Sequence, residues 1–384
     1  MLGINSNINS LVAQQNLNGS QNALSQAITR LSSGKRINSA ADDAAGLAIS
    51  TRMQTQINGL NQGVSNANDG VSMIQTASSA LSSLTNSLQR IRQLAVQAST
   101  GTMSSTDQAA LQQEVAQQIQ EVNRIASQTT YNGTNILNGN AGIVSFQVGA
   151  NVGQTISLDL SQSMSAAKIG GGLVQKGQTV GTVTGLSLDT AGVYTSSGAA
   201  ITAINVLSDG QGGYTFTDQN GGAIAQTVAQ SVFGASATTS NGTAVGNLSI
   251  QASATSTSMS SAALTAITNA VAQINAVNKP ATVSGLDIST VSGANVAMVS
   301  IDNALQTVNN VQAQLGAAQN RFTAIATAQQ AESTDLSSAQ SQITDANFAQ
   351  ETANMSKNQV LQQAGISVLA QANSLPQQVL KLLQ

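Results

Sequence analysis

Three residue types are missing from the 384-residue sequence, which contains no cysteine, no histidine and no tryptophan. Without cysteine the chain can form neither a disulfide nor a thiolate zinc site, so bridges give no information on its compartment. Without histidine the commonest general base and metal ligand is absent, and no side chain has an ordinary pKa between 5 and 8. These absences exclude zinc-protease chemistry based on two histidine ligands, and they predict assembly that is indifferent to modest changes of pH.

Charge is also scarce. Only 8% of the residues are charged, against about 25% in an ordinary soluble domain, and the net charge is -3. That charge gives no field strong enough to attract nucleic acid or an anionic membrane. No stretch approaches the roughly 18 apolar residues of a membrane span, and the start of the sequence lacks the basic and apolar regions of a cleavable secretory signal. We therefore expect neither nucleic-acid nor membrane binding.

Narrow apolar seams with a seven-residue period lie at both ends of the chain. In the C-terminal seam, within residues 348–384, each of the first three members is followed four residues later by a small or branched residue. Isolated helices draw most of their stability from packing, so we expect the two ends to pair and a further partner to cover what remains. Each seam contains one unexplained six-residue step, at Leu11–Leu17 and at Met355–Leu361. The seam residues are Ile4, Leu11, Leu17, Leu24 and Leu31 at one end and Leu361, Val368, Leu375 and Leu382 at the other.

Helical periodicity is longest between residues 53 and 91, where apolar residues step by four and three in alternation. The pattern changes phase once, at Ala77, and predicts a helix of about fifty residues. Gly59, Gly63 and Gly70 each cost such a helix about 0.5–1 kcal/mol, so we expect a neighbour to pack closely against them. A second long helix is predicted downstream, with a polar gap at Gln329. Its ladder of seven-residue steps consists of Ile301, Val308, Leu315 and Phe322.

Shorter signals lie between these helices. Ser105 and Gln108 form a capping box that predicts the start of a helix. Apolar residues alternate with polar or small ones at residues 144–148 and 156–160, on either side of a turn, and this pattern predicts a β-hairpin. From about residue 171 to 285 the helical period disappears, and short runs such as 214–216 stand between Gly, Ser, Thr and Asn clusters. This composition favours a small β-rich domain over the alternative of disorder.

The predicted fold class is mostly α, with an inserted β-rich domain. Both chain ends together form a long antiparallel helical bundle or coiled coil, to which a β-hairpin and an outer β domain are added. We expect a terminal coiled-coil domain from residues 1–41 and 346–384, and a long-helix domain with the hairpin from 42–170 and 286–345. Residues 171–285 then form an outer, surface-exposed domain.

Motifs for chemistry are weak throughout. Gly34–Lys35 lacks the first glycine and the final Ser or Thr of a phosphate loop. The glycines at 210–213 lack the third glycine and the βαβ unit of a dinucleotide turn. Asp42–Asp43 suits helix-start electrostatics better than acid–base or metal chemistry, because adjacent side chains on a helix point apart. We therefore predict no catalytic, cofactor or metal site.

Two other features leave alternatives open. Arg90 and Arg92 form either a solvated helix face or a contact surface. Asn132 and Asn241 match the N-glycosylation pattern, which carries little meaning in a chain without a secretory signal.

Four motifs resemble bacterial flagellin, the subunit of the flagellar filament. They are LSSGKRINSAADDAAGLAI, SLQRIRQLAVQAS, LGAAQNRF and, near the end, LQQAGISVLAQANSLPQQVL. The resemblance covers roughly residues 1–170 and 286–384, and the order of the motifs is that of the family. The central part matches no family pattern, which fits flagellins because their middle region varies.

The resemblance implies a structural protein rather than an enzyme. In flagellins the terminal segments pair as a coiled coil and pack against other subunits as the inner tube of the filament, which propels the cell. Subunits are exported unfolded by the flagellar type III system without a cleaved signal, and they fold at the tip under a cap protein. The implied localisation is secreted and extracellular, in the filament. The implied bacterial partners are other copies of the chain, the cap protein, the hook–filament junction protein and an export chaperone for the C-terminal segment.

Host receptors are implied as well. Flagellins are recognised by a Toll-like receptor through a surface that filament packing buries. The positions that match this surface are Gln89, Arg90, Leu94 and Glu114. Positions resembling the segment read by a cytosolic inflammasome sensor are Val379, Leu380, Leu382 and Leu383, although Lys381 and Gln384 depart from the commoner pattern. Gln340 and Gln342 replace arginines common in flagellins, so subunit salt bridges are not expected there.

Three alternatives stay open on the sequence. A hook–filament junction protein is also secreted and helical at both ends, but the LQQAG and NRF stretches argue against it. The inserted domain could house an enzyme, as in some flagellins. Its Ser and Thr residues could also carry O-linked sugars.

Overall fold

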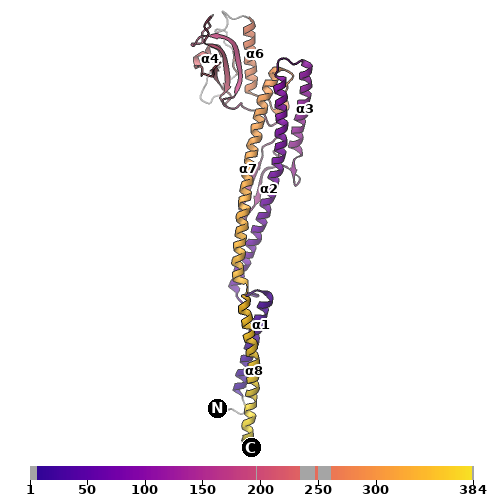
Figure 1. Cartoon of the computed structure of the whole chain (residues 1–384), viewed down its shortest axis with the longest axis vertical. Helices are drawn as coiled ribbons and strands as arrows, with labels where there is room; N and C mark the ends of the chain where they lie inside the picture. The colour runs from indigo at the N-terminus through magenta and orange to yellow at the C-terminus, as the bar shows by residue number, and fades with distance from the viewer. Residues whose placement is uncertain (1–6, 196, 234–246, 250–260, 383–384) are drawn as a thin grey trace. The chain divides into compact units, whose positions relative to one another are not determined.

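The structure is a computed structural model that describes residues 7–195, 197–233, 247–249 and 261–382, with side chains except at 226–227, 261–263 and 375–382. The chain divides into two compact units. The first, termed unit 1, comprises residues 1–68, 147–155 and 324–384, and the second, unit 2, comprises 69–146 and 156–323. Two long helices, α2 (Ala44–Ala98) and α7 (Val291–Thr344), contribute to both units (Figure 1).

In unit 1 the two chain ends form an antiparallel helix pair, α1 (Ile8–Ser33) and α8 (Phe348–Leu382). The side chain of Asn7 donates to the carbonyl of Ala372 at 2.8 Å, whereas Arg30 lies 3.3 Å from Glu351. Figure 1 shows the two helices side by side. Asn7 also caps α1 by accepting from the Ser10 amide, and α1 ends at Gly34, whose φ of 69° is left-handed. The prediction that the two ends pair is confirmed.

The glycines of α2 lie at close contacts, as predicted. In unit 1 a methyl group on Gly59 would meet Ala150, and one on Gly63 would overlap the carbonyl of Val148. In unit 2 a methyl group on Gly70 would lie 2.8 Å from the ring of Phe322. Each glycine therefore allows another segment to approach the helix.

Unit 2 contains the apolar helical core. The α7 ladder from Ile301 to Phe322 is at most 1% exposed, and the phase change at Ala77 lies inside the core, because Ala77 is fully buried. Fully or almost fully buried residues of α2 are Ile74, Leu81, Leu84, Leu88, Ile91 and Leu94. Both predicted ladders are confirmed.

A third helix and the hairpins complete this part of the chain. Helix α3 spans Ser105–Gln128, and its N-cap is Ser104, which accepts from the Asp107 amide. The predicted cap was therefore one residue too late, and Gln108 instead donates to the carbonyl of Ala98 at 3.1 Å. The predicted hairpin is confirmed as β3 (Gly142–Gln147) and β4 (Thr155–Leu160), and a two-residue pair, β1 (Thr130–Tyr131) with β2 (Thr134–Asn135), precedes it.

The inserted region holds a three-stranded antiparallel sheet in the order β5-β6-β7, formed by Thr179–Leu188, Ile201–Ser208 and Tyr214–Asp218. Helices α4 (Gln226–Phe233) and α6 (Ser261–Asn278) and the 3-10 helix η2 (Val283–Gly285) follow. The prediction of a region without helical period was wrong for α4, which buries Val228, Val232 and Phe233, and for α6, which buries Ile267, Val271, Ile274 and Val277. The buried residues of α6 recur at steps of four and three, so the helical signal was present.

Aspartate turns recur in this sheet. Asp189, Asp209 and Asp218 each accept, through one carboxylate oxygen, the amides two and four residues later. A glycine with positive φ stands three residues after each aspartate. Local aspartate-to-backbone bonds of this kind fix tight turns. The glycines at 210–213, which we interpreted as a loop, belong to the second of these turns.

Candidate functional site

The face by which α8 contacts α1 mixes small and polar residues with a few larger apolar ones. On α1 the half-buried and buried positions include Ala13, Leu17, Leu24, Ala27 and Leu31. The less exposed positions of α8 recur at steps of four and three, which is the pattern of a two-helix seam. The positions in this pattern are Glu351, Met355, Asn358, Gln362, Gly365, Leu369 and Ala372.

The predicted seam residues fall into two groups. Leu17, Leu24 and Leu31 lie on the contacting face of α1. Leu11 is 62% exposed, and on α8 Leu361 and Val368 are 45% and 57% exposed. Within one chain α1 therefore leaves the C-terminal ladder uncovered, which corrects the pairing expected from the sequence. Ile4 and the side chains of Leu375 and Leu382 lie outside the described residues.

The six-residue steps explain this division. At about 100° per residue, seven residues nearly complete two turns, whereas six fall about 120° short of them. Each step therefore moves the ladder to another face of its helix. In α1 the face changes from outward at Leu11 to inward at Leu17, and in α8 it changes from half-buried Met355 to outward Leu361.

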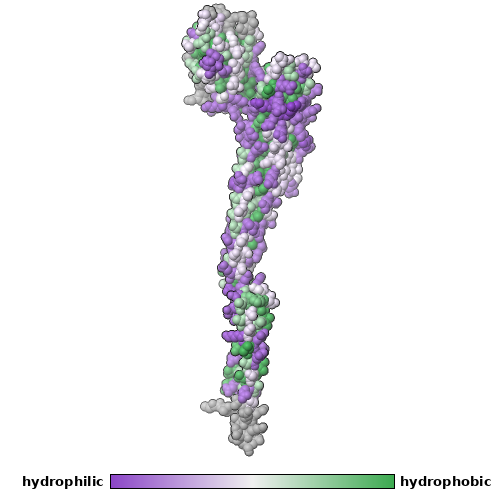
Figure 2. All heavy atoms as spheres, viewed as in Figure 1, coloured by the Kyte–Doolittle hydropathy of each residue, from purple (hydrophilic) through white to green (hydrophobic). Residues whose placement is uncertain are grey.

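Large apolar side chains are consequently exposed along both helices. Figure 2 shows hydrophobic patches over this helix pair. Contiguous patches of this kind mark interaction surfaces. The exposed residues are Ile8, Leu11, Val12 and Ile28 on α1 and Phe348, Val360, Leu361, Ile366 and Val368 on α8.

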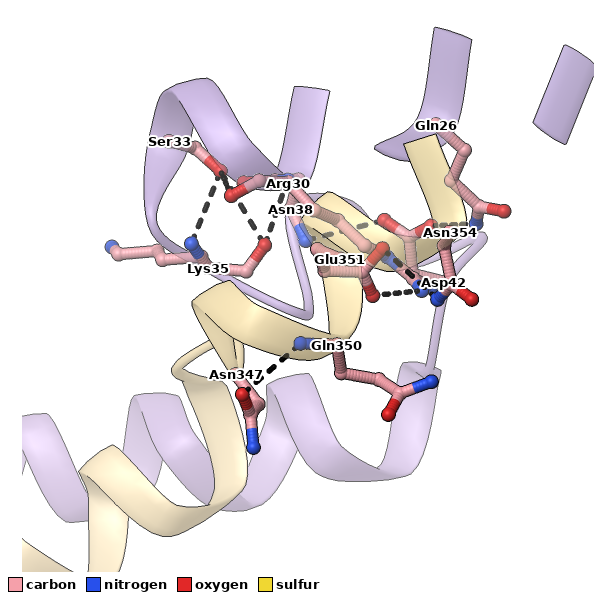
Figure 3. A network of polar contacts seen from close by, with 10 residues as sticks. All are labelled: Gln26, Arg30, Ser33, Lys35, Asn38, Asp42, Asn347, Gln350, Glu351 and Asn354. Atoms are coloured by element: carbon pink, nitrogen blue, oxygen red, sulfur yellow. Dashed lines mark hydrogen bonds and ion pairs between the residues drawn. The ribbon is translucent and has the colours of Figure 1, made fainter. Parts of the chain in front are cut away.

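A polar junction lies where α1 ends and α8 begins (Figure 3). Arg30 and Glu351 form an ion pair whose side chains are 24% and 11% exposed. The side chain of Asn347 caps α8 by accepting from the amide of Gln350 at 3.2 Å. This junction adds an ion pair to the hydrogen bond that Asn7 donates to Ala372 at the other end of the helix pair.

The link between α1 and α2 is organised by two aspartates. Amides of Ser39 and Asn38 donate to Asp42 and lower its pKa below the usual 3.8, and the side chain of Gln26 adds a further bond. Asp43 accepts from the amide of Gly46 at 2.9 Å, in the first turn of α2. The helix-start interpretation is confirmed for Asp43, whereas Asp42 instead accepts from the link that precedes α2.

The structure also gathers most of the predicted receptor set, in unit 2. Arg90 of α2 and Glu114 of α3 form an ion pair at 2.6 Å, and Gln89 is exposed beside them. Leu94 is only 1% exposed and lies in the core, which corrects its predicted place on the receptor surface. Arg92 pairs with Asp302 of α7 at 2.7 Å, a partner that helical periodicity alone does not reveal.

The inflammasome-sensor positions cannot be placed. Val379, Leu380 and Leu382 belong to α8, but their side chains, like Leu383, lie outside the described residues. Gln340 uses its amide within the chain, since it donates to the carbonyl of Ser50 at 3.0 Å.

Among the described residues no three His, Cys, Asp or Glu side chains gather as a metal site would need. None of the described helices is long and apolar enough to span a bilayer. Paired terminal helices with outward apolar faces are typical of a class of structural subunits that assemble with copies of themselves.

Comparisons with known proteins identify the family. Residues 4–142 match the bacterial flagellin N-terminal helical region, 172–277 the flagellin D2 domain, and 298–383 the bacterial flagellin C-terminal helical region. The match at 172–277 corrects the sequence interpretation that the central part follows no family pattern. The chain is 37% identical to B-type flagellin of Pseudomonas aeruginosa, with all of both chains covered. It is 35% identical to flagellin B of Vibrio cholerae, covering 100% of this chain and 99% of that one.

A solved structure agrees. FliC from Burkholderia pseudomallei is 65% identical, with a TM-score of 0.61, and the match covers 66% of this chain and all of that one. The chain therefore belongs to the bacterial flagellin family. It is a structural subunit of the flagellar filament, secreted and extracellular, and not an enzyme.

Proposed function

We propose that the chain polymerises through the outward faces of α1 and α8. The observation that carries this proposal is the exposure of large apolar side chains on the outward faces of the helix pair. Leucines such as Leu17 and Leu24 lie on the inner face, whereas Leu11, Leu361 and Val368 are exposed. At about 25 cal/mol per Å² of apolar surface removed from water, covering these faces in an assembly is strongly favourable.

The test is seeded polymerisation, followed by electron microscopy. Deleting residues 348–384 should abolish filaments, while the circular dichroism of the remaining helices persists. A point variant, Leu361→Asp, should greatly slow growth, and Gln363→Asp, also exposed on α8, is the matched control. Filaments of normal length from the deletion variant would refute the proposal.

The same proposal assigns the three domains. Residues 1–41 and 346–384 form the polymer core, 42–170 and 286–345 the next shell, and 171–285 the outer domain. This division differs from the compact units of the single chain, because it follows the expected layers of the filament. Limited proteolysis of filaments should release fragments from 171–285 first, and early cleavage within 1–41 would contradict the assignment.

Export as an unfolded chain by the flagellar type III system, with a chaperone holding the C-terminal segment, is part of the proposal. The absence of cysteine supports it, because no cross-link can obstruct threading. The cap protein and the hook–filament junction protein are the proposed partners at the two ends of the filament. A pull-down of the cytoplasmic chaperone with the intact chain, lost on deleting 348–384, tests the chaperone contact.

Recognition of the monomer by a Toll-like receptor is proposed at Gln89, Arg90 and Glu114. The exposed ion pair of unit 2 supports it. Arg90→Ala should reduce receptor signalling by monomer, with Arg124→Ala, another exposed ion-paired arginine, as control. Unchanged signalling by Arg90→Ala would refute the assignment. The inflammasome-sensor segment, Val379 to Leu383, remains a prediction.

A further inference from the structure

An exposed asparagine–glycine pair, Asn132–Gly133, forms the tip of the hairpin that joins β1 to β2. Asn132 has a φ of 48° and is the one non-glycine residue with positive φ in the described part of the chain. Gly133 follows with a φ of 78°. Positive φ at both central residues is typical of a type I′ turn, which asparagine followed by glycine adopts readily. The N-glycosylation pattern at Asn132, which the filament role does not explain, therefore lies at an open turn.

Both groups that react in asparagine deamidation are unengaged at this tip. In that reaction the backbone nitrogen of the next residue attacks the side-chain carbonyl carbon, and glycine obstructs the approach least because it has no side chain. Within the described ranges, neither the side chain of Asn132 nor the amide of Gly133 takes part in a hydrogen bond. Apart from its chain neighbours, no described residue lies within 4 Å of the point where a Cβ on Gly133 would stand. The two reacting groups are therefore unobstructed.

Two other asparagine–glycine pairs lie inside helices, at Asn18 in α1 and at Asn58 in α2. The helical backbone holds the amide of each following glycine in a hydrogen bond to the carbonyl four residues earlier. The side-chain oxygen of Asn58 also accepts from Gln54 at 3.0 Å. Attack by either glycine nitrogen therefore requires local unwinding of a helix.

The two remaining described pairs lie in turns, and each has a hydrogen bond that the pair at Asn132 lacks. The side-chain oxygen of Asn138 accepts from the amide two residues later at 2.9 Å. After Asn220, the amide of Gly221 donates to the carbonyl of Asp218 at 3.1 Å. The side chain is thus held in the first of these pairs, and the attacking nitrogen is held in the second.

We infer that Asn132 is a site of spontaneous deamidation, with water as the co-reactant. The nitrogen of Gly133 forms a bond to the side-chain carbonyl carbon of Asn132. The bond from that carbon to the side-chain nitrogen breaks, and this nitrogen takes up the amide proton and leaves as ammonia. Water then opens the resulting succinimide ring at one of its two carbonyl carbons. The products are aspartate and isoaspartate, so the net change is the replacement of NH2 by OH.

The hairpin is short enough to open at its tip. Strands β1 and β2 contain two residues each, and the pair beside the tip is Tyr131 with Thr134. Two-stranded hairpins are at best marginally stable. At the base, the amide of Ile136 donates to the carbonyl of Thr129 at 3.2 Å, and Ile136 is 1% exposed. The backbone rotation that ring closure requires therefore disturbs the tip and leaves the anchored base in place.

The products change the turn in two ways. Both add a negative charge at position 132. Isoaspartate also lengthens the backbone by one carbon, which is incompatible with a two-residue turn between Tyr131 and Thr134. This modification needs no enzyme and does not depend on assembly of the chain.

The test measures deamidation site by site in the full-length folded monomer. The chain is incubated at mildly alkaline pH and digested under acidic conditions that stop the reaction, and its peptides are quantified by mass spectrometry. Isoaspartate is identified with a carboxyl methyltransferase specific for that residue. The matched controls are the pairs at Asn58, Asn138 and Asn220. The pair at Asn18 is not used, because α1 depends on α8 for its packing, and Asn241 lies outside the described residues.

A parallel incubation in urea removes the hydrogen bonds, so that the unfolded chain reports the reactivity due to sequence alone. We expect Asn132 to convert at least fivefold faster than each of the three controls in the folded monomer, and all four rates to differ by less than threefold in urea. A control that converts as fast as Asn132 in the folded chain would overturn the inference. The same lead of Asn132 in urea would overturn it as well, because the turn would then contribute nothing.

Discussion

Alanine substitution of two glycines should change stability in opposite directions. Gly70 of α2 contacts the ring of Phe322, and an added methyl group would lie 2.8 Å from that ring. Phe322 is fully buried and packs edge-to-face on Phe146, with ring centroids 5.3 Å apart. The ring therefore has little room to move. Gly316 of α7 has no neighbour within 4 Å of the corresponding position.

The magnitudes follow from two opposing effects. Alanine is favoured over glycine inside a helix by about 1 kcal/mol, and overpacking a filled core costs about 1–3 kcal/mol. Gly316→Ala should therefore stabilise unit 2 by roughly 0.5–1 kcal/mol. Gly70→Ala should destabilise it by up to about 2 kcal/mol, because the clash outweighs the helix preference.

Urea unfolding of the monomer, monitored by circular dichroism at the helix band, measures both changes. The two variants share one chain and one substitution, so the difference between them isolates the contact with Phe322. If Gly70→Ala proved as stabilising as Gly316→Ala, the close approach of Phe322 to α2 would be refuted.

Three further outcomes are expected. Ser104→Ala should destabilise α3 by about 1 kcal/mol, and Ser105→Ala should be near neutral. Thermal melting compares the two variants, and a larger loss from Ser105→Ala would show that Ser105 is the cap, as the sequence predicted. Because the folded pKa of Asp42 lies below 3.8, its carboxylate contributes stability above pH 3.8 that is lost as pH falls through the lower folded value. In the Asp42→Asn variant the melting temperature of unit 1 should therefore depend less on pH in that range. An unchanged pH dependence would contradict this. Arg30→Met should weaken filaments by about 2 kcal/mol, because it leaves Glu351 without its partner; dissociation temperatures should recover in the double variant Arg30→Met with Glu351→Met, and no recovery would exclude a pairwise effect.

Periodicity predicted those elements whose packing lies within the chain. Both long ladders were found because large residues at steps of three and four report directly on burial in a helix. Gly70 was interpreted correctly because a glycine in a long helix needs a packing reason. The cap of α3 was missed by one residue, since SSTDQ offers two serines and the choice depends on where the chain turns.

The terminal helices show where sequence patterns fail. Hydrophobic periodicity predicted that Leu361 and Val368 are covered, but it cannot distinguish a partner helix of the same chain from another copy. The inner face of α8 gives only a weak apolar signal, because Asn358, Gln362 and Gly365 interrupt it between Met355 and Leu369. The link from Arg92 to Asp302 spans 210 residues and depends on tertiary structure alone.

The pairing of the two chain ends has a consequence for the order of folding. Asn7 and Ala372 are separated by 365 residues, whereas Arg90 and Glu114 are separated by 24. Since loop-closure entropy grows as the logarithm of loop length, joining the ends of an unfolded chain costs about 2 kcal/mol more than the shorter closure. The bridge between Lys35 and Asp345 shortens this loop once it has formed, so α1 and α8 should join last. In a newly made subunit, α1 and α8 should then still be unpaired when the subunit meets its neighbours.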